Sequence, residues 1–135
     1  MVRPGGWVFA VGISRFTSLL DGISSGYLDY PVFARIVEQD LQDGQHRNPD
    51  NHPGYFTTAF FHHPDELQAE VCEVGWSIVE TVGIEGLGWW MPKEFADWWD
   101  DETRRERLLA AVRAVENEPT LLGLGPHLMV VARSN

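Results

Sequence analysis

The sequence predicts a single α/β domain over residues 1–135. Short apolar runs at Trp7–Ile13, Trp76–Ile84 and His127–Ala132 are typical of strands, and segments with helix start and stop signals lie between them. A chain of 135 residues also has the usual length of one domain. The expected order is strand, helical insertion, helix, strand, helix, strand. It gives a three-stranded mixed sheet rather than a complete doubly wound one.

The first half of the chain begins with a turn and a strand. Arg3-Pro4-Gly5-Gly6 is a turn signal, and the almost unbroken apolar run that follows predicts a strand covered on both faces. Thr17–Ile23 predicts a short helical turn. Pro31–Asp43 predicts a helix with proline at its first position and Gly44 at its end. The polar segment Gly44–Gly54 predicts a long loop of the kind that covers binding sites.

The second half contains the clearest helix signals. Pro64–Val74 has proline first, acidic residues in its first turn, an apolar face, and Gly75 just beyond its end. Trp76–Ile84 alternates as a strand does. Asp101 is a suitable cap for a helix over Glu102–Glu116, and Pro119 stops that helix.

Charge and cysteine content restrict the partners and the compartment. Ten Lys and Arg against twenty Asp and Glu give a net charge of −10, which argues against nucleic acid and membrane surfaces as partners. Cys72 is the single cysteine and cannot form an internal disulfide. No apolar run approaches the roughly 20 residues of a membrane span. We therefore expect a cytoplasmic protein.

Tryptophan is concentrated in one segment, between Trp89 and Trp99. One interpretation is an aromatic core or a cap over it, because tryptophan buries a large area with few torsions. The other is one wall of an apolar ligand pocket. The first is favoured on general grounds, because large aromatic side chains are mostly buried.

Several segments carry a family resemblance. They are Arg3-Pro4-Gly5-Gly6 before an apolar strand, Asp65-Glu66-Leu67 through Gly75-Trp76, Ile13–Phe16, Asp43–Pro49, Tyr55–Phe60 and Trp99-Asp100-Asp101. In this order they resemble the C-terminal portion of class I S-adenosylmethionine-dependent methyltransferases, of a bacterial small-molecule type. The resemblance implies a partial Rossmann-like fold with strand order 5-7-6 of the family. It also implies an antiparallel closing strand between the other two and a lid-like insertion over residues 17–61.

The donor-binding elements of that family are absent from this chain. In the family, S-adenosylmethionine rests on a glycine-rich loop after the first strand, and both that loop and the acidic ribose ligand precede the Arg-Pro-Gly-Gly turn. Gly86-Leu87-Gly88 and Gly123-Leu124-Gly125 are interpreted as turns that do not open a helix, so neither replaces the loop. No cofactor-binding residue is predicted. S-adenosylmethionine is the cofactor implied for a complete enzyme, and none is expected for this chain alone.

Two functions remain open. The chain is either the acceptor-side part of a methyltransferase, inactive alone, or a stand-alone non-catalytic domain that binds or senses a small ligand. Whether it is an enzyme by itself is undecided, and no catalytic base is assigned.

Candidate substrate-binding residues follow the first strand or lie in the insertion. Ligands of open α/β sheets bind beyond the carboxyl ends of the strands. The candidates are Ser14, Arg15, Phe16, Tyr27, His46, Arg47, Tyr55, Phe56 and Thr57. Structural roles compete with each: Arg15 can pair with a carboxylate, His46 and Arg47 can bond loop carbonyls, and the aromatic rings can pack.

The histidines do not predict a metal site. His62 and His63 are adjacent and point apart on a strand or turn, and no zinc-type spacing includes them. His63 also directly precedes the helix start at Pro64, which is a capping position. A nucleophilic triad at Ser14 or Cys72 finds no support in the spacing either.

The first strand predicts self-association. Trp7–Ile13 should pair on both sides, and no upstream strand exists to pair with it. An exposed apolar edge of this kind invites strand addition. We therefore expect a homo-oligomer or a missing N-terminal half as the protein partner, and a small-molecule acceptor if the fold is completed.

Overall fold

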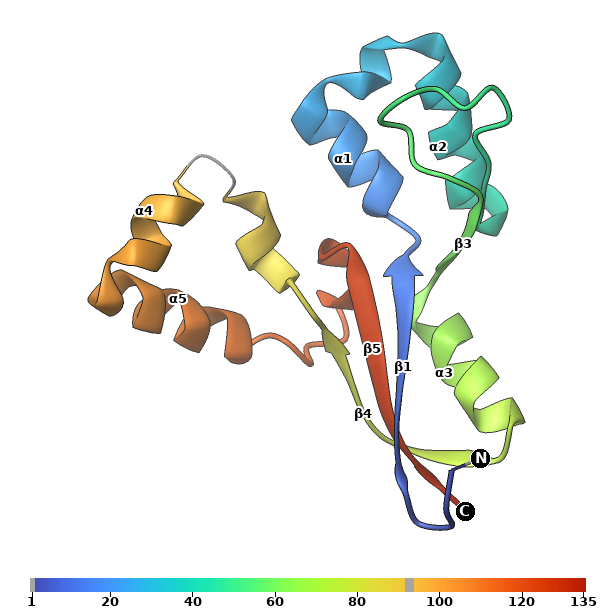
Figure 1. Cartoon of the computed structure of the whole chain (residues 1–135), viewed down its shortest axis with the longest axis vertical. Helices are drawn as coiled ribbons and strands as arrows, with labels where there is room; N and C mark the ends of the chain where they lie inside the picture. Colours follow the sequence, from blue (N-terminus) through green and yellow to red (C-terminus); the bar gives the residue numbers. More distant parts are fainter. Residues whose placement is uncertain (1, 92–93) are drawn as a thin grey trace.

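The computed structural model describes residues 2–91 and 94–135 and shows an α/β fold built on a five-stranded mixed sheet (Figure 1). The strand order is β2-β3-β1-β5-β4. The strands are β1 (Trp7–Ser14), β2 (Gln45–His46), β3 (Ala59–His62), β4 (Trp76–Gly83) and β5 (His127–Ser134). The closing strand β5 lies between β1 and β4 and is antiparallel to both.

The prediction of three strands is wrong, because the segment assigned to the insertion contributes two more. β3 runs parallel to β1 and pairs with it at Ile13↔Phe61 and Ser14↔His62. β2 pairs antiparallel with β3. β2 has two residues, and β3 has only the four that an alternating pattern needs as a minimum, with the adjacent apolar residues Phe60 and Phe61 breaking the alternation. The sequence therefore predicts a loop over Gln45–His46 and no strand over Ala59–His62.

The helices follow the sequence signals where those signals are strong. They are α1 (Thr17–Ser25), α2 (Pro31–Asp43), α3 (Pro64–Glu73), α4 (Phe95–Asp100) and α5 (Glu102–Arg113), with short 3-10 helices η1 (Tyr27–Asp29), η2 (Gly86–Trp90) and η3 (Leu122–Leu124). The bounds of α2 are as predicted. The Asp101 side chain accepts a hydrogen bond from the Arg104 backbone N–H, which confirms the predicted cap of α5.

Two corrections concern the segment after β4. Gly86–Trp90 is a 3-10 helix and not a turn, and α4 was not predicted. The glycine run 123–125 likewise contributes to η3. Helix α5 also ends at Arg113 rather than near Glu116.

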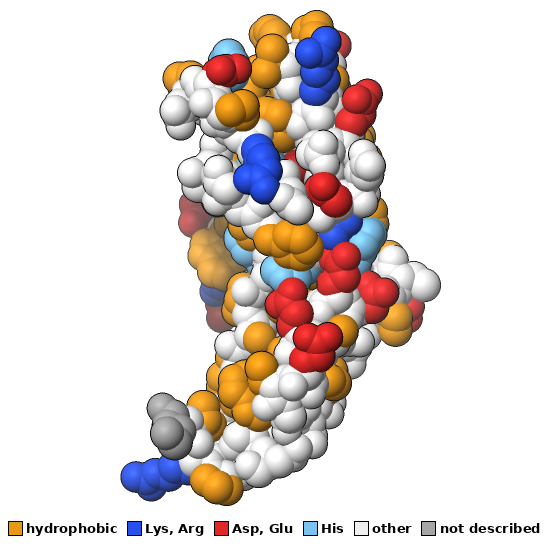
Figure 2. Space-filling model, turned by 90° about the vertical axis from the view of Figure 1, so that its right-hand side faces the viewer, with side chains coloured by type: hydrophobic (Ala, Val, Ile, Leu, Met, Phe, Trp, Pro, Cys, Tyr) orange, Lys and Arg blue, Asp and Glu red, His pale blue; other side chains and the backbone are white. Residues whose placement is uncertain are grey.

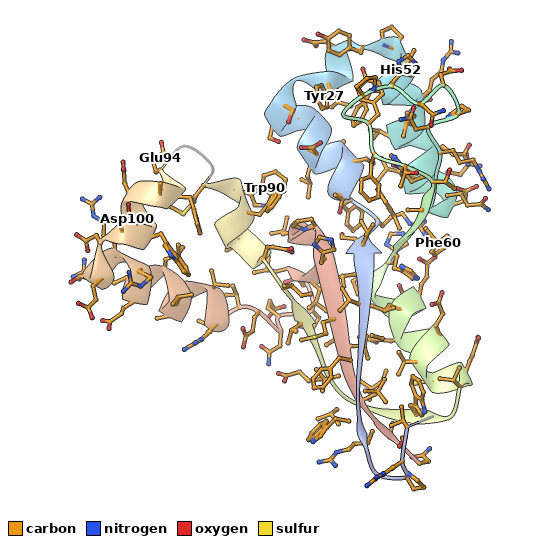
Figure 3. All side chains as sticks on the ribbon, in the orientation of Figure 1. Tyr27, His52, Phe60, Trp90, Glu94 and Asp100 are labelled. Carbon is orange, nitrogen blue, oxygen red and sulfur yellow. The ribbon has the colours of Figure 1, made fainter. Side chains whose placement is uncertain are left out.

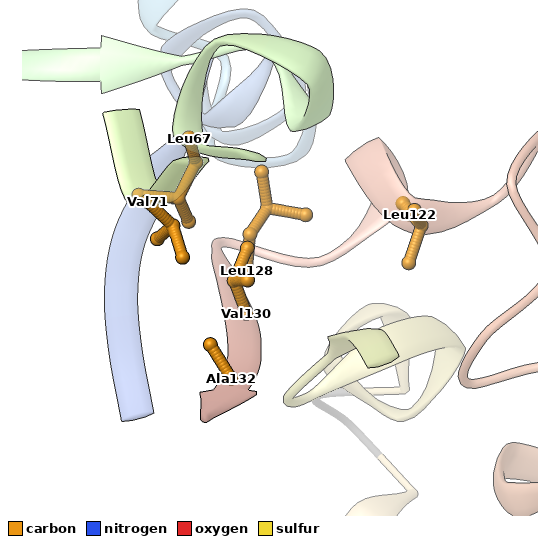
Figure 4. Close-up of a cluster of buried hydrophobic side chains, with 6 residues drawn as sticks. All are labelled: Leu67, Val71, Leu122, Leu128, Val130 and Ala132. Carbon is orange, nitrogen blue, oxygen red and sulfur yellow. The ribbon is translucent and has the colours of Figure 1, made fainter. Parts of the chain in front are cut away.

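The core lies between α3 and one face of the sheet (Figure 4). Leu67 and Val71 of α3 pack against Leu128, Val130 and Ala132 of β5, and Leu122 joins this cluster. Leu128, Val130 and Ala132 are fully buried, because β5 lies between β1 and β4 beneath the helix. Alternate residues of one strand therefore carry most of this core.

The opposite face of β1 is exposed, so the expectation of a strand covered on both faces is wrong. Trp7, Phe9 and Val11 are 50%, 62% and 55% exposed, whereas Gly12 and Ser14 on the other face are buried. No helix of the described chain covers this side of the strand. The apolar run indicated a strand correctly but could not show which parts of the chain would cover it.

Two groups of helices project from the sheet (Figures 1 and 3). The lid, defined here as residues 17–58, stands beyond the carboxyl end of β1 and carries Tyr27 and His52 near its top. The arm, defined as η2, α4 and α5, follows β4 and extends from the sheet to the left in Figure 3, with Trp90 in its first helix. No helix of the described residues is long and apolar enough to cross a membrane.

The side of the molecule that carries α3 is acidic (Figure 2). Acidic side chains gather there next to histidines, and α3 supplies Asp65, Glu66, Glu70 and Glu73 to this surface. Among them, Glu70 lies 3.3 Å from His62 Nε2.

Candidate ligand pocket

A pocket of about 500 Å³ lies between the carboxyl end of β1 and the lid. We call it the lid pocket. Ile13 is contributed by β1, Thr17 and Ser18 by α1, and Phe33 by α2. Tyr55 and Phe56 come from the loop between β2 and β3, residues 47–58, which we call the lid loop. Phe61 of β3 adds a third aromatic ring, and Pro126, His127 and Trp89 complete the other side. The pocket has the size and the mainly apolar lining of a small-molecule site.

A buried polar cluster holds the lid together beside this pocket. Asp40 Oδ2 accepts hydrogen bonds from Ser18 Oγ at 2.5 Å and from His46 Nδ1 at 2.8 Å, and both Asp40 and His46 are almost completely buried. His46 Nε2 lies 2.8 Å from the Tyr55 carbonyl oxygen. The cluster thus connects α1, α2 and the lid loop.

The pKa of His46 is raised by this environment. Burial by itself lowers the pKa, but the hydrogen bonds to Asp40 and to the Tyr55 carbonyl, together with the Asp40 charge, outweigh it. A protonated His46 donates from both ring nitrogens, to Asp40 and to Tyr55. Both ring nitrogens of His46 therefore hold the lid together, and neither is free to bind a ligand.

Hydrogen bonds of the Asn48 side chain fix the conformation of the lid loop, and this conformation includes a strained backbone at Phe56. The Asn48 side chain donates to the carbonyls of His52 and Phe56 and accepts from the His52 N–H, each at 2.9 Å. Phe56 has a φ of +64°, a conformation that non-glycine residues rarely adopt. The Tyr55 ring packs against Phe33 with centroids 4.8 Å apart. These contacts place two aromatic rings at the pocket.

On the sheet side, His127 forms a close pair with Glu85. His127 Nδ1 lies 2.6 Å from Glu85 Oε1, and the His127 backbone N–H donates to Glu85 Oε2 at 3.1 Å. The Ile84 N–H donates to the His127 carbonyl at 3.0 Å. His127 also lines the lid pocket. The Glu85 carboxylate therefore holds the Nδ1 side of an imidazole ring that belongs to the pocket wall.

The structure brings three of the predicted site residues to the lid pocket. His46, Tyr55 and Phe56 line it. Tyr27 packs behind them, with its ring 5.5 Å from Tyr55 and 5.4 Å from Phe33. Thr57 is exposed outside the lining.

The remaining predicted residues have structural partners away from the lining. Arg15 donates twice to the Glu66 carboxylate, at 2.6 and 2.8 Å, and once to the Phe61 carbonyl. Ser14 Oγ donates to the Gly123 carbonyl at 3.0 Å. Phe16 contacts His63 edge to face. Arg47 is exposed and bonds to Gln45.

Several pocket residues were not predicted. Thr17, Ser18, Asp21 and His127 line the pocket, and Glu85 orients His127. The predicted strand Trp7–Ile13 indicated that ligands bind beyond its carboxyl end. The first residue of β5, His127, lies at this end because β5 is antiparallel to β1. A predicted antiparallel closing strand therefore contained the signal for His127, which the site prediction did not use.

The tryptophan-rich segment lines a second pocket and does not form a core. All six tryptophans lie in the described residues, and none of them is buried. Trp89, Trp90, Phe95 and Trp99 line a groove of about 750 Å³ between α1 and the arm. Trp89 and Asp21 line both this groove and the lid pocket. Of the two interpretations, the pocket wall is the one that the structure shows.

Among the described residues, the strand-to-helix junctions lack the glycine-rich loop on which S-adenosylmethionine rests in the family that the sequence resembles. Helix α1 follows β1 after Arg15 and Phe16, and α3 follows β3 with Pro64 at its first position, so neither junction has a glycine. Gly86 opens η2 after β4, but a Cβ on Gly125 would lie 2.8 Å from the Gly86 nitrogen. These glycines pack against each other and leave no room for a ligand between them.

Across residues 2–91 and 94–135, no cluster of three or more His, Cys, Asp or Glu side chains is arranged to hold a metal ion. No family model matches the chain, and no curated protein matches it.

Proposed function

We propose that the chain is the acceptor-side part of an S-adenosylmethionine-dependent methyltransferase and is inactive alone. Its role is to bind a small, mainly apolar acceptor in the lid pocket. The residues that hold the methyl donor belong to polypeptide outside these 135 residues, and the complete enzyme works in the cytoplasm. The resemblance of the sequence segments to that family suggests the reaction class.

The observation that carries the proposal is the position of the lid pocket. It opens at the carboxyl end of β1, the edge at which ligands of open α/β sheets bind. The lid covers it from α1, α2 and the lid loop, and a covering segment of this kind excludes water from a reacting group. The antiparallel position of β5 between β1 and β4 agrees with the fold that the resemblance implies.

The acidic surface supports a small molecule rather than a nucleic acid as acceptor. The chain has a net charge of −10, which repels a phosphate backbone. The lid pocket encloses few polar groups, and most of these bond to the protein itself. An acceptor therefore gains affinity mainly by burying apolar surface.

Two titrations test the proposal. Calorimetry of the isolated chain with S-adenosylmethionine is expected to show no binding. Ligand-observed NMR against a panel of small phenols, aromatic acids and aliphatic alcohols is expected to show binding of aromatic members. Micromolar binding of S-adenosylmethionine by the chain alone contradicts the proposal that other polypeptide holds the methyl donor. Binding of no panel member contradicts the acceptor site.

A stand-alone binding domain is the competing function. It also predicts a ligand in the lid pocket, but its activity needs no second polypeptide. The two are distinguished by adding a separately expressed donor-binding half of a class I methyltransferase. Donor-dependent methylation of a panel compound supports the proposal, and unchanged ligand binding without methylation favours the stand-alone domain.

A further inference from the structure

We propose that His127, oriented by Glu85, is the proton acceptor of the lid pocket, and that the molecule bound there presents an acidic hydroxyl group, as a phenol does. This inference rests on the proposed function, because it takes the lid pocket as the acceptor site. It adds a catalytic residue, a positioning residue and a substrate class to that site.

The geometry of the pair fixes the histidine tautomer. Both Glu85 oxygens are engaged by one residue: Oε1 lies 2.6 Å from His127 Nδ1, and Oε2 accepts the His127 backbone N–H at 3.1 Å. An ionised carboxylate only accepts hydrogen bonds, so Nδ1 must carry the proton. In the neutral ring, Nε2 then has a free lone pair.

His127 Nε2 has no hydrogen-bond partner in the described part of the chain. The side chain is 42% exposed and its residue lines the lid pocket, so Nε2 is accessible to a bound molecule. The residue is also held firmly. The Ile84 N–H binds its carbonyl, and the adjoining Gly125 and Gly86 backbones are in close contact. A base positioned in this way needs little reorganisation when the proton moves.

Several other polar side chains of the pocket are already engaged in hydrogen bonds within the protein. Thr17 Oγ donates to the Pro126 carbonyl, and Ser18 Oγ donates to Asp40. His46 has both nitrogens engaged. Asp21 accepts from Ser25 and has a carboxylate, whose proton affinity at neutral pH is ordinarily lower than that of an imidazole. His127 is therefore the group of this lining best suited to accept a proton near neutral pH.

The step is a single proton transfer. The O–H bond of the bound hydroxyl breaks, its proton forms a bond with His127 Nε2, and the electron pair stays on the oxygen. The products are an oxyanion and an imidazolium whose Nδ1–H still donates to Glu85. A phenol suits this step better than an aliphatic alcohol, because its proton is far more acidic and its ring matches the aromatic lining of Phe33, Tyr55 and Phe56.

The tautomer can be measured without any ligand. Long-range ¹H–¹⁵N NMR on the full chain with labelled histidine, at about pH 9 where imidazoles are neutral, is expected to show His127 protonated at Nδ1. In Glu85→Gln, the amide oxygen accepts the backbone N–H while the amide NH₂ donates to Nδ1, so the proton moves to Nε2. Asp50→Asn is the matched control. It alters the pair of His52, whose side chain has the same 42% exposure, and leaves His127 unchanged.

Proton transfer is measured with 4-nitrophenol, whose anion is yellow and whose neutral form is colourless. Wild-type protein is expected to bind it and to increase the ionised fraction of the bound probe at neutral pH. His127→Asn keeps a hydrogen bond to Glu85 but offers no base, so it should bind the probe about tenfold more weakly and should not increase its ionised fraction. Glu85→Gln should also lower the ionised fraction of the bound probe relative to wild type.

The outcomes separate this inference from the proposed function. If wild-type protein does not bind 4-nitrophenol, both the acceptor site and the phenol class are wrong. If the probe binds but His127→Asn and Glu85→Gln ionise it as well as wild type does, the proton-acceptor role alone is wrong. A His127 protonated at Nε2 in the wild-type protein also overturns it.

Discussion

At the residue scale, His46 makes the stability of the lid depend on pH. The folded-state pKa of His46 lies above its ordinary value of 6.5, so folding favours the protonated form. The stabilisation is complete below the ordinary pKa and is lost as pH rises through the folded-state pKa. We expect the thermal midpoint, followed by circular dichroism, to fall as pH is raised across this window.

Asp40→Asn should reduce that pH dependence, because the buried charge that stabilises the imidazolium is gone. Asp43→Asn removes a half-buried carboxylate at the end of the same helix and should keep it. Equal slopes for wild type and Asp40→Asn show that the His46 pair does not contribute.

Phe56 should separate pocket binding from loop stability. Its φ of +64° suits glycine, so Phe56→Gly relieves strain while removing an aromatic ring from the lid pocket. We expect the free energy of unfolding to change by less than about 1 kcal/mol, and a bound phenol to lose about tenfold in affinity. Asn51→Gly is the control, because Asn51 has a φ of +51° in the same loop but does not line the pocket. Equal binding by the two variants excludes a role for the Phe56 ring.

The sequence predicted the lid side of the pocket better than its sheet side. His46, Tyr55 and Phe56 were found because a long polar loop with aromatic residues suggests a cover over a site. His127 and Glu85 lie 42 residues apart and meet only through the antiparallel pairing of β5 with β4, which brings the start of β5 beside the residues that precede η2. No local pattern reports such a contact, so the candidate base was missed.

At the element scale, strong start and stop signals predicted helices and weak ones did not. Proline at the first position and glycine after the last residue placed α2 and α3 correctly. The apolar run of β1 predicted the strand, but it did not predict that only one face of the strand would be covered. β3 is a strand because its backbone pairs with β1 and β2, a tertiary cause that four residues cannot encode in a periodic pattern.

Gly44 should be the most sensitive glycine at the junction of α2 and the sheet. It has a φ of +74°, and an added Cβ would lie 2.3 Å from the Phe61 carbonyl oxygen. Gly26, at the end of α1, has a φ of +73° but open space around it. Chemical denaturation should show a loss of more than about 2 kcal/mol for Gly44→Ala and about 1 kcal/mol for Gly26→Ala. Equal losses mean that the close approach to Phe61 does not restrict this position.

At the scale of the whole molecule, the exposed face and edge of β1 predict self-association. β3 pairs with β1 only at Ile13 and Ser14, so the edge from Trp7 to Gly12 has no strand partner among the described residues. Trp7, Phe9 and Val11 expose apolar side chains on the same strand. An unpaired apolar edge is a template for strand addition.

Light scattering after size exclusion is expected to show a dimer or larger species for wild type. Phe9→Lys should shift the chain toward monomer. Val74→Lys should not, although Val74 is 61% exposed and Phe9 62%, because Val74 lies at the end of α3. A monomeric wild-type chain contradicts strand addition through β1.

The central claim, that the chain binds an acceptor but not the methyl donor, is tested most directly by NMR titration of the labelled protein. With 4-nitrophenol, we expect backbone shifts concentrated at the lid pocket, around Ile13, Tyr55, Phe56 and His127. With S-adenosylmethionine, we expect none. Shifts caused by S-adenosylmethionine, or phenol shifts that avoid the lid pocket, contradict the account.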